Sequence, residues 1–267
     1  MLRITELRLP LDHPEEELRK AVVTRLGVSS ADLLSYSVFR RAWDARKKSA
    51  IKLIYTIDAE VRDEARVRAR LKDDRHVNPA PDTTYKFVAR APERVEKRPV
   101  VIGTGPCGFM CALVLAQMGF RPIVLERGRV VRQRTKDTWG LWRRGVLDPT
   151  SNAQFGEGGA GTFSDGKLHS GISDPRHHGR KVLTEFVKAG APGGILCVAK
   201  PHIRTVRLVT VVENGRAGIE ALGGEYRFGT KVVDLDIADE GNGKRHVRGV
   251  VLEDGSTIET DHVVLAV

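Results

Sequence analysis

The sequence contains little cysteine and no long hydrophobic run. Its 267 residues include three cysteines, Cys107, Cys111 and Cys197, which are too few for a disulfide framework. No apolar stretch approaches the roughly 20 residues that cross a bilayer, and residues 1–6 lack the apolar core of a secretory signal. These absences exclude disulfide-rich secreted domains and membrane-spanning helices. We therefore expect a cytoplasmic protein without a membrane partner, in which Cys107 and Cys111 are small buried side chains.

The sequence also lacks a cluster of metal ligands. His177 and His178 are adjacent in a polar, basic loop, but no cysteine or carboxylate accompanies them at ligand spacing, so we expect no metal site. Positive charge, in contrast, is in excess, with a formal net charge of +10. Because the lysines and arginines are interleaved with acids along the whole chain, we interpret most of them as solvated surface. Charge alone therefore does not favour a nucleic-acid partner.

The most informative stretch of the sequence runs from residue 98 to residue 128. Residues 100–102 are β-branched and apolar, which predicts a short buried parallel strand. Three glycines follow in the spacing Gly-x-Gly-x-x-Gly. Residues 109–118 carry no charge and predict a helix that is buried nearly all round. Gly119 ends this helix, and residues 122–125 predict a second strand that ends on Glu126.

The residues of this turn have mechanical roles in binding a dinucleotide. Gly103 permits the tight turn, Gly105 lets a pyrophosphate approach the backbone, and Gly108 lets helix and strand pack closely. Pro106 suits the first helical turn, where its missing N–H is no loss. The helix N-terminus then offers free N–H groups to the phosphates. The alternative is an ordinary strand-to-helix turn whose glycines are fortuitous.

Glu126 stands about 20 residues beyond the glycines, where an acid accepts the ribose hydroxyls of a bound dinucleotide. The acid would repel a 2′-phosphate, whereas Arg127 could bind one, so this stretch leaves NADP open. A strand, three glycines, a helix and a second strand ending in an acid together predict a dinucleotide-binding site. The candidate site residues in this stretch are Gly103, Thr104, Gly105, Pro106, Cys107, Gly108, Glu126 and Arg127.

Residues 1–95 predict a small domain in front of this stretch. The pattern indicates a strand, a helix with Asp12 as its N-cap and Gly27 at its end, two strands, a short helix and a last strand. The order β-α-β-β-α-β is that of the ferredoxin-like split βαβ arrangement. Residues 91–97 are the candidate linker. The expected elements cover residues 4–9, 12–26, 33–41, 50–61, 63–71 and 83–89.

The ferredoxin-like fold also occurs in RNA-recognition modules, which carry aromatic residues on a central strand beside a glycine-rich motif. Residues 51–57 contain one aromatic residue, Tyr55, and no glycine. Tyr36, Phe39 and Trp43 lie on or near the preceding strand, where aromatic residues usually serve packing. We therefore favour a docking or structural role for this domain over RNA contact. Exposure of Tyr36 or Tyr55 among basic residues would favour RNA.

A second glycine-rich stretch covers residues 152–168. Five of its glycines lie within about a dozen residues, which is too many for the interior of a helix or strand. Such a backbone can approach a flat or phosphorylated ligand, and its N–H groups can form a nest for an anion. The alternative is a flexible loop. Phe155, Phe163 and Leu168 argue against that alternative, because a solvated linker has no need of apolar residues at intervals.

Together the motifs at residues 103–108, 125–128 and 155–168 resemble those of the uncharacterised bacterial FAD-dependent dehydrogenase, or NAD(FAD)-utilizing dehydrogenase, family. The resemblance extends from end to end of the chain, and the third motif is its most specific part. It implies FAD as the cofactor, a loop lying near the flavin and the pyrophosphate, and contact of the adenine ring with the backbone at Val232. The loop residues that it adds to the site are Gly158, Gly159, Gly161, Thr162, Ser164, Asp165, Gly166 and Lys167.

The chain departs from the family pattern at three positions. Arg204 and Val206 stand where the family usually has Gly and Asp, and Gly215 stands where a larger apolar residue is expected. Residues 206–222 have apolar side chains at helical spacing, so we expect a helix there that is interrupted at Gly215. The glycine pair at 223–224 ends this helix.

The last part of the sequence predicts an antiparallel meander and a returning strand. The expected meander strands cover residues 231–237, 247–252 and 256–259, with turns at 241–243 and 254–255. Residues 261–267 then form an apolar strand suited to the middle of a parallel sheet, with Ala266 completing the candidate site. A plain NAD domain would continue in regular βα units. The predicted fold is therefore α/β, a Rossmann-like FAD-binding domain over residues 96–267 behind the ferredoxin-like domain.

These features together predict an FAD-dependent oxidoreductase with NAD(P)H as a candidate electron donor. The small-molecule substrate stays unknown, and no residue stands out as a catalytic acid or base. One alternative is an RNA-binding or protein-docking module in which the flavin is structural or regulatory; a further alternative is an NAD(P)-binding dehydrogenase. Because the sequence stops inside an apolar strand, we expect it to be a fragment whose missing C-terminal part completes the substrate pocket.

Overall fold

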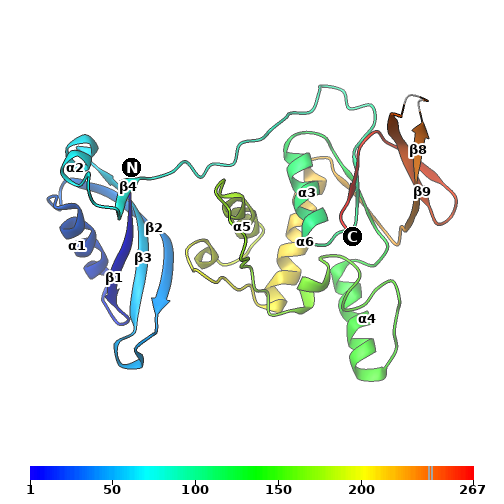
Figure 1. The fold of residues 1–267 in the computed structure, drawn as a ribbon. Helices are drawn as coiled ribbons and strands as arrows, with labels where there is room; N and C mark the ends of the chain where they lie inside the picture. The colour runs from blue at the N-terminus through cyan, green and yellow to red at the C-terminus, as the bar shows by residue number, and fades with distance from the viewer. Residues whose placement is uncertain (240, 242) are drawn as a thin grey trace. The chain divides into compact units, whose positions relative to one another are not determined.

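The computed structural model of the chain describes every residue except 240 and 242. Figure 1 shows the order of its helices and strands. The chain forms two compact units. The first unit comprises Met1–Thr84, Leu168–Lys181 and Gly193–Pro201, and the second comprises Tyr85–Lys167, Val182–Pro192 and His202–Val267.

The first unit contains a four-stranded antiparallel sheet with strand order β2-β3-β1-β4. This strand order and the element order are those of the split βαβ arrangement, as the sequence predicts. Alternate residues of β3 are buried, which is the period of a strand with one face on a core. The elements are β1(Leu2–Pro10), α1(Glu15–Leu26), β2(Leu33–Asp44), η1(Lys48–Ala50), β3(Lys52–Val61), α2(Glu64–Arg70) and β4(Val77–Pro79).

Two boundaries in the first unit differ from the prediction. The N-cap of α1 is Pro14 and not Asp12, whereas Gly27 ends the helix in the left-handed region with φ of 60°. The edge strand is β4, where Val77 pairs with Ile4, and not the segment 83–89. Residues 80–98, all of which the structure describes, form neither helix nor strand. The rings of Tyr85 and Phe87 pack on each other, and the segment joins no sheet.

Three aromatic residues of the first sheet, Tyr36, Phe39 and Tyr55, serve packing, whereas Trp43 is 50% exposed. Tyr55 is 4% exposed in the core, and its hydroxyl makes a 2.9 Å hydrogen bond with Nε2 of His13. Tyr36 packs against the same core and is partly buried. The guanidinium of Arg3 lies 3.5 Å from the centroid of the Phe39 ring. Neither tyrosine therefore forms the exposed stacking surface that RNA recognition on this sheet would need.

The second unit contains a parallel sheet with strand order β11-β5-β6-β7 and an antiparallel sheet with order β10-β9-β8. The returning strand beside the first strand and the meander are thus confirmed. The predicted turn at 241–243 includes residue 242, which lies outside the described residues. The strands are β5(Val100–Ile102), β6(Ile123–Glu126), β7(Glu225–Phe228), β8(Val232–Asp239), β9(Arg245–Leu252), β10(Thr257–Glu259) and β11(Val263–Leu265).

The other elements among the described residues are four helices and two short 3-10 turns. They are α3(Pro106–Gln117), α4(Val131–Arg144), η2(Ala160–Phe163), α5(His178–Lys188), η3(Gly193–Leu196) and α6(Thr205–Ala221). The interpretation of His177 and His178 as part of a loop is wrong for His178, which begins α5. No helix among the described residues is long and apolar enough to cross a membrane.

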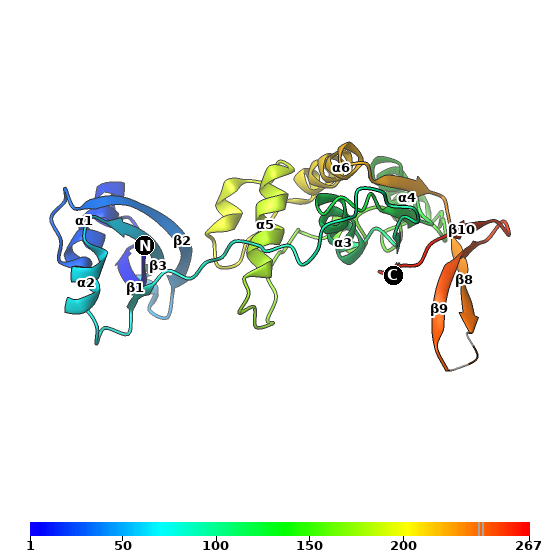
Figure 2. The same ribbon diagram turned by 90° about the horizontal axis from the view of Figure 1, so that it is seen from above.

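Gly215 does not interrupt α6, which is continuous from Thr205 to Ala221. A Cβ added at Gly215 would lie 2.2 Å from Cζ of Phe109 on α3. The expectation of a break is therefore wrong, and the reason is tertiary: the missing side chain leaves the space that the Phe109 ring fills. Figures 1 and 2 show the two helices side by side.

The two central strands of the parallel sheet, β5 and β6, are buried throughout, which explains their nearly continuous apolar sequences. One face packs on α3 and α6 through a cluster that includes Val101, Val124 and Ile219. The other face packs on the meander through a cluster that includes Ile102, Leu125 and Val250. These two layers fix the carboxyl ends of β5 and β6, where ligands bind in open α/β sheets.

Candidate functional site

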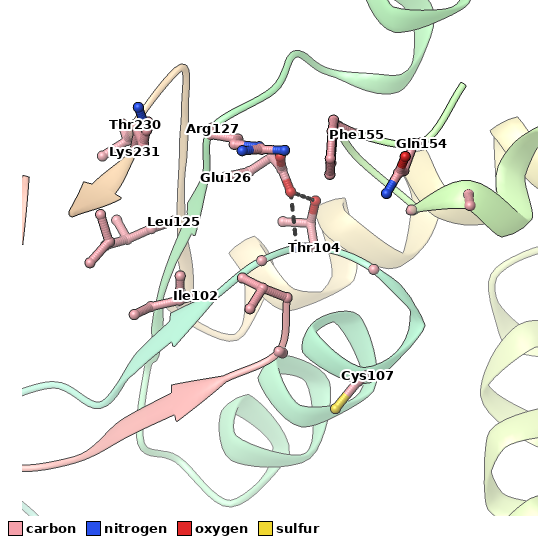
Figure 3. Close-up of a pocket in the computed structure, with 18 of the residues that line it drawn as sticks. Ile102, Thr104, Cys107, Leu125, Glu126, Arg127, Gln154, Phe155, Thr230 and Lys231 are labelled. Atoms are coloured by element: carbon pink, nitrogen blue, oxygen red, sulfur yellow. Dashed lines mark hydrogen bonds between the residues drawn. The ribbon is translucent and has the colours of Figure 1, made fainter. Parts of the chain in front are cut away.

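A cavity of about 590 Å³ opens at the carboxyl ends of β5 and β6. Figure 3 shows that its walls come from the turn after β5, the end of β6, the second glycine-rich stretch and the start of β8. Segments from distant parts of the sequence therefore share one site. The sequence-predicted residues that line it are Gly103, Thr104, Gly105, Pro106, Cys107, Glu126, Arg127, Gly159, Val232 and Ala266.

Two of the three glycines after β5 are required by the fold itself. Gly103 has φ of 98°, and a Cβ there would lie 2.5 Å from the carbonyl oxygen of Ala266. A Cβ at Gly108 would lie 2.0 Å from the carbonyl oxygen of Gly103. The first glycine thus makes the turn, and the third lets α3 pack against it, as the sequence predicts.

Gly105 differs from these two glycines. Its φ of −65° suits any residue, and the nearest atom to a Cβ there would be Cα of Gly159, at 4.0 Å. The protein itself therefore leaves room for a side chain at this position, which lines the cavity. A glycine that the fold does not need, placed at a cavity wall, fits a backbone approached closely by a ligand.

The first turn of α3 forms part of the same wall. Pro106 is the first helical residue, so its missing N–H costs no helical hydrogen bond. The remaining free N–H groups and the positive end of the helix dipole favour an anionic group at this place. Cys107 is exposed, contrary to the expectation of a buried side chain, because it lies on the open first turn. Cys111 is half-buried, and burial raises the pKa of its thiol.

Glu126 is 6% exposed and is hydrogen-bonded to the glycine turn. Its Oε2 accepts hydrogen bonds from the backbone N–H of Thr104 at 3.0 Å and from the Thr104 hydroxyl at 2.6 Å, as drawn in Figure 3. Its Oε1 accepts from the backbone N–H of Gly128 at 2.7 Å. The carboxylate therefore ties the end of β6 to the turn after β5 while it lines the cavity.

A cation and an aromatic ring also line the cavity. The guanidinium carbon of Arg127 lies 3.6 Å from the centroid of the Phe155 ring, and Figure 3 shows the two side chains together. Lys231 also lines the cavity, and its Nζ makes an ion pair with Glu253 at 2.6 Å. Two basic side chains and the anion-favouring helix end line the same cavity, which suits it to a ligand with phosphate groups.

The two glycine-rich segments touch through their backbones. The N–H of Gly158 donates to the carbonyl oxygen of Thr104 at 3.0 Å. A Cβ at Gly159, whose φ is 63°, would lie 2.9 Å from Cα of Gly105. The second stretch therefore closes over the first turn, and a side chain at Gly159 would push the two segments apart.

The remaining predicted residues do not line the cavity as the described residues form it. Gly108 lies under the turn, and Gly158 and Thr162 are packed together. The Ser164 hydroxyl donates to the carbonyl oxygen of Gly161 at 2.8 Å, which orders the loop locally. Asp165 and Lys167 form an exposed ion pair at 3.1 Å, which lowers the pKa of Asp165. A Cβ at Gly166 would lie 1.6 Å from the carbonyl oxygen of Ile203, so this glycine serves backbone packing.

Sequence analysis missed several residues of the wall, namely Gln154, Phe155, Gly156, Ala160, Thr230 and Lys231. Phe155 and Gly156 belong to the motif at residues 155–168, so their position in that motif could have identified them as site residues. Thr230 is placed by tertiary structure, because its N–H donates to the carbonyl oxygen of Glu126 at 3.0 Å. No local pattern in the sequence predicts that hydrogen bond. Among the described residues, no group of three or more His, Cys, Asp or Glu side chains is placed to hold a metal ion.

Comparison with known proteins gives one match to a protein-family model, a Domain of unknown function (DUF8436), over residues 1–60. A curated relative, an uncharacterized protein of Clostridium beijerinckii, is 37% identical over 266 residues, which is 100% of this chain and 48% of the relative. The chain thus spans about half the length of the curated relative that it matches.

Among solved structures, the chain is similar to THI4 of Thermovibrio ammonificans, with 18% identity, coverage of 64% of this chain and 57% of that chain, and a TM-score of 0.43. It is also similar to 3-ketosteroid-delta4-(5alpha)-dehydrogenase of Rhodococcus jostii, with 16% identity, 66% and 48% coverage and a TM-score of 0.40. The third is thioredoxin reductase of Lactococcus lactis, with 15% identity, 64% and 35% coverage and a TM-score of 0.32.

Proposed function

We propose that the chain binds FAD in this cavity and forms the cofactor-binding part of an FAD-dependent oxidoreductase. The observation that carries the proposal is the cradle at Gly105, where the fold leaves space for a side chain and the sequence has none. That space lies at the N-terminal end of α3, where a pyrophosphate finds free N–H groups.

The chain's own residues would hold the cofactor from three sides. The turn from Gly103 to Gly108 would receive the pyrophosphate, with Gly159 of the second stretch close above it. The carboxylate of Glu126, which keeps lone pairs beyond its three hydrogen bonds, would accept a ribose hydroxyl. The backbone near Val232 would contact the adenine ring.

The strand arrangement supports FAD over NAD(P). A meander of β8, β9 and β10 stands between α6 and the returning strand β11. A plain NAD domain would have further parallel βα units in that place. When bound, FAD would supply two-electron redox chemistry. The protein's contribution is to bind and orient it.

The reaction partners belong to the same proposal. We propose a small-molecule substrate and NAD(P)H as the electron donor, with the substrate pocket completed by further polypeptide. The clostridial relative supports the last point, because this chain spans 48% of it. We propose no nucleic-acid partner, since the ring of Tyr55 is buried.

The test is the flavin content and ligand preference of the purified chain. FAD, FMN, NAD⁺ and NADP⁺ are titrated separately, with flavin fluorescence or calorimetry as the readout. We expect FAD to bind much more tightly than FMN, because FMN lacks the adenosine that Glu126 and the β8 start would contact. A chain that binds NAD⁺ or NADP⁺ but not FAD would overturn the proposal.

A further inference from the structure

Arg134 is a charged residue at a core position of α4. Its side chain is fully buried, and it shares the buried face of the helix with Val131 and Thr138. A buried guanidinium is expensive unless its donors are satisfied. Burial accordingly lowers the pKa of Arg134 to about 10. The hydrogen-bond partners of this side chain therefore indicate the role of the buried charge.

Four hydrogen bonds join Arg134 to a single segment of the second glycine-rich stretch. Its Nε donates to the carbonyl oxygen of Asn152 at 2.8 Å, and its Nη2 donates to that of Ala153 at 2.9 Å. Its Nη1 donates to the carbonyl oxygens of Glu157 at 2.7 Å and Gly159 at 2.8 Å. Since the segment has no helix or strand of its own, these carbonyls need donors from elsewhere.

The fit between Arg134 and the segment is also steric. A Cβ at Gly156, whose φ is 112°, would lie 2.6 Å from Cδ of Arg134. The next residue, Glu157, is 2% exposed and accepts from the N–H of Val131 at 2.7 Å and from Nε of Arg216 at 2.8 Å. The segment is therefore held to α4 by both its carbonyls and a carboxylate, and to α6 by an ion pair.

We propose that Arg134 is a positioning residue for the dinucleotide site. It holds the carbonyl of Gly159 so that this glycine sits against Gly105, and it fixes the turn that presents Phe155 to Arg127. The inference rests on the proposed function. The inference goes beyond the proposed function, because it states that a side chain outside the cavity determines the shape of one cavity wall.

The chemistry of arginine explains why no other side chain would serve. A planar guanidinium carries five N–H donors in a fixed fork and can reach carbonyls on several sides. A lysine offers three donors at one point, and an apolar side chain offers none. Arg134→Lys should therefore hold the segment incompletely, and Arg134→Met should release it.

The experiment compares FAD binding and loop protection in matched variants of the 267-residue chain. Arg134→Met and Arg134→Lys are the test variants. Arg132→Met, on the same helix but in an exposed ion pair with Glu213, is the surface control. Ile219→Val, in the core between α3 and α6, is the control for general destabilisation. The readouts are the FAD dissociation constant, the shape of the bound-flavin absorbance bands and amide hydrogen exchange over residues 152–160.

We expect Arg134→Met to weaken FAD binding at least about tenfold, with Arg134→Lys in between. Exchange over residues 152–160 should rise in both, and the bound flavin should show altered bands. The two controls should keep the dissociation constant within about twofold, although Ile219→Val should lower the melting temperature. Unchanged FAD binding and exchange in Arg134→Lys or Arg134→Met would overturn the inference. If Arg134→Met does not fold, Arg134→Lys decides.

The two proposals fail separately in this design. If the unsubstituted chain takes up no FAD, the proposed function fails. Hydrogen exchange then still decides whether Arg134 positions the segment, because it needs no ligand. Faster exchange confined to residues 152–160 would support the positioning role, and unchanged exchange would refute it.

Discussion

The Oε2 atom of Glu126 accepts two hydrogen bonds from Thr104, one from its backbone N–H at 3.0 Å and one from its hydroxyl at 2.6 Å. The acid at the end of β6 thus fixes the turn after β5. A residue expected to contact the ribose has a second task, which is to keep the glycine turn in the shape that a pyrophosphate needs. Substitution of Glu126 should therefore affect both binding and stability.

Glu126→Ala should weaken FAD binding by about 1–3 kcal/mol, which is roughly fivefold to 150-fold, for the loss of a charged hydrogen bond. The unfolding free energy should also fall, because the N–H groups of Thr104 and Gly128 lose their acceptor. FAD titration and urea denaturation measure the two effects. Thr104→Ser, which keeps the hydroxyl donor, is the matched control and should bind FAD nearly normally. Normal FAD affinity in Glu126→Ala would refute the assigned role.

Gly105→Ala tests whether glycine at this position is needed for FAD binding and not for the stability of the fold. The added methyl finds no protein atom closer than 4.0 Å, so the unfolding free energy should stay within about 1 kcal/mol of the unsubstituted value. FAD affinity should drop at least about tenfold, because the methyl occupies the place of the pyrophosphate. Gly103→Ala is the contrast: with φ of 98° and a contact at 2.5 Å, it should destabilise the fold itself. FAD binding unchanged in Gly105→Ala would contradict the site.

The elements that sequence analysis predicted are those with a strong local pattern. The strand, glycine turn, helix and second strand at 100–126 follow from β-branched residues, three glycines and an uncharged helix. The missed strand β7 reads Glu-Tyr-Arg-Phe and is half-buried throughout, so it lacks an apolar run. Helix α4 was missed because its buried face contains Arg134, which reads as a surface residue in any hydrophobicity pattern.

The residues of the candidate site also fall into those that local sequence patterns could place and those that depend on tertiary contacts. Residues at fixed offsets from a glycine, such as Pro106 and Glu126, could be placed from spacing alone. The meeting of Gly105 and Gly159 could not, because it depends on a loop returned to the first turn by Arg134 and by the bond from Gly158 to Thr104. Gly215 shows the reverse error: a local rule indicated a break in a helix, but packing against Phe109 explains the glycine.

Titration of the Glu157 carboxyl should contribute to the pH dependence of stability. Burial raises the pKa of this carboxyl above its usual value of 4.5, so the folded chain binds more protons than the unfolded chain between 4.5 and the raised pKa. Stability contributed by the carboxyl therefore falls as the pH rises through that window. We expect the unfolding free energy of the unsubstituted chain relative to Glu157→Gln to decrease as the pH rises above 4.5 in urea titrations. An increase over the same range would mean that the ion pair with Arg216 outweighs burial.

The close approach of α3 and α6 gives the sharpest test of the fold. Gly215→Ala places a methyl 2.2 Å from Cζ of Phe109, which is 8% exposed and cannot move freely. Overpacking of this kind costs about 1–3 kcal/mol, more than the gain in helix propensity of about 1 kcal/mol. Gly218→Ala is the matched control on the same helix, where a Cβ meets nothing within 4 Å, so it should stabilise the chain.

A double-mutant cycle identifies the partner of Gly215. Phe109→Leu removes the ring and alone leaves a void, so it should destabilise the chain. In the double variant the methyl at 215 enters space that the ring has vacated. The double variant should therefore lose less unfolding free energy than the sum of the two single-variant losses, by about 1 kcal/mol or more. Urea denaturation of the four proteins measures this coupling. Additive losses, or a Gly215→Ala variant as stable as Gly218→Ala, would show that the two helices do not approach each other through Gly215 and Phe109.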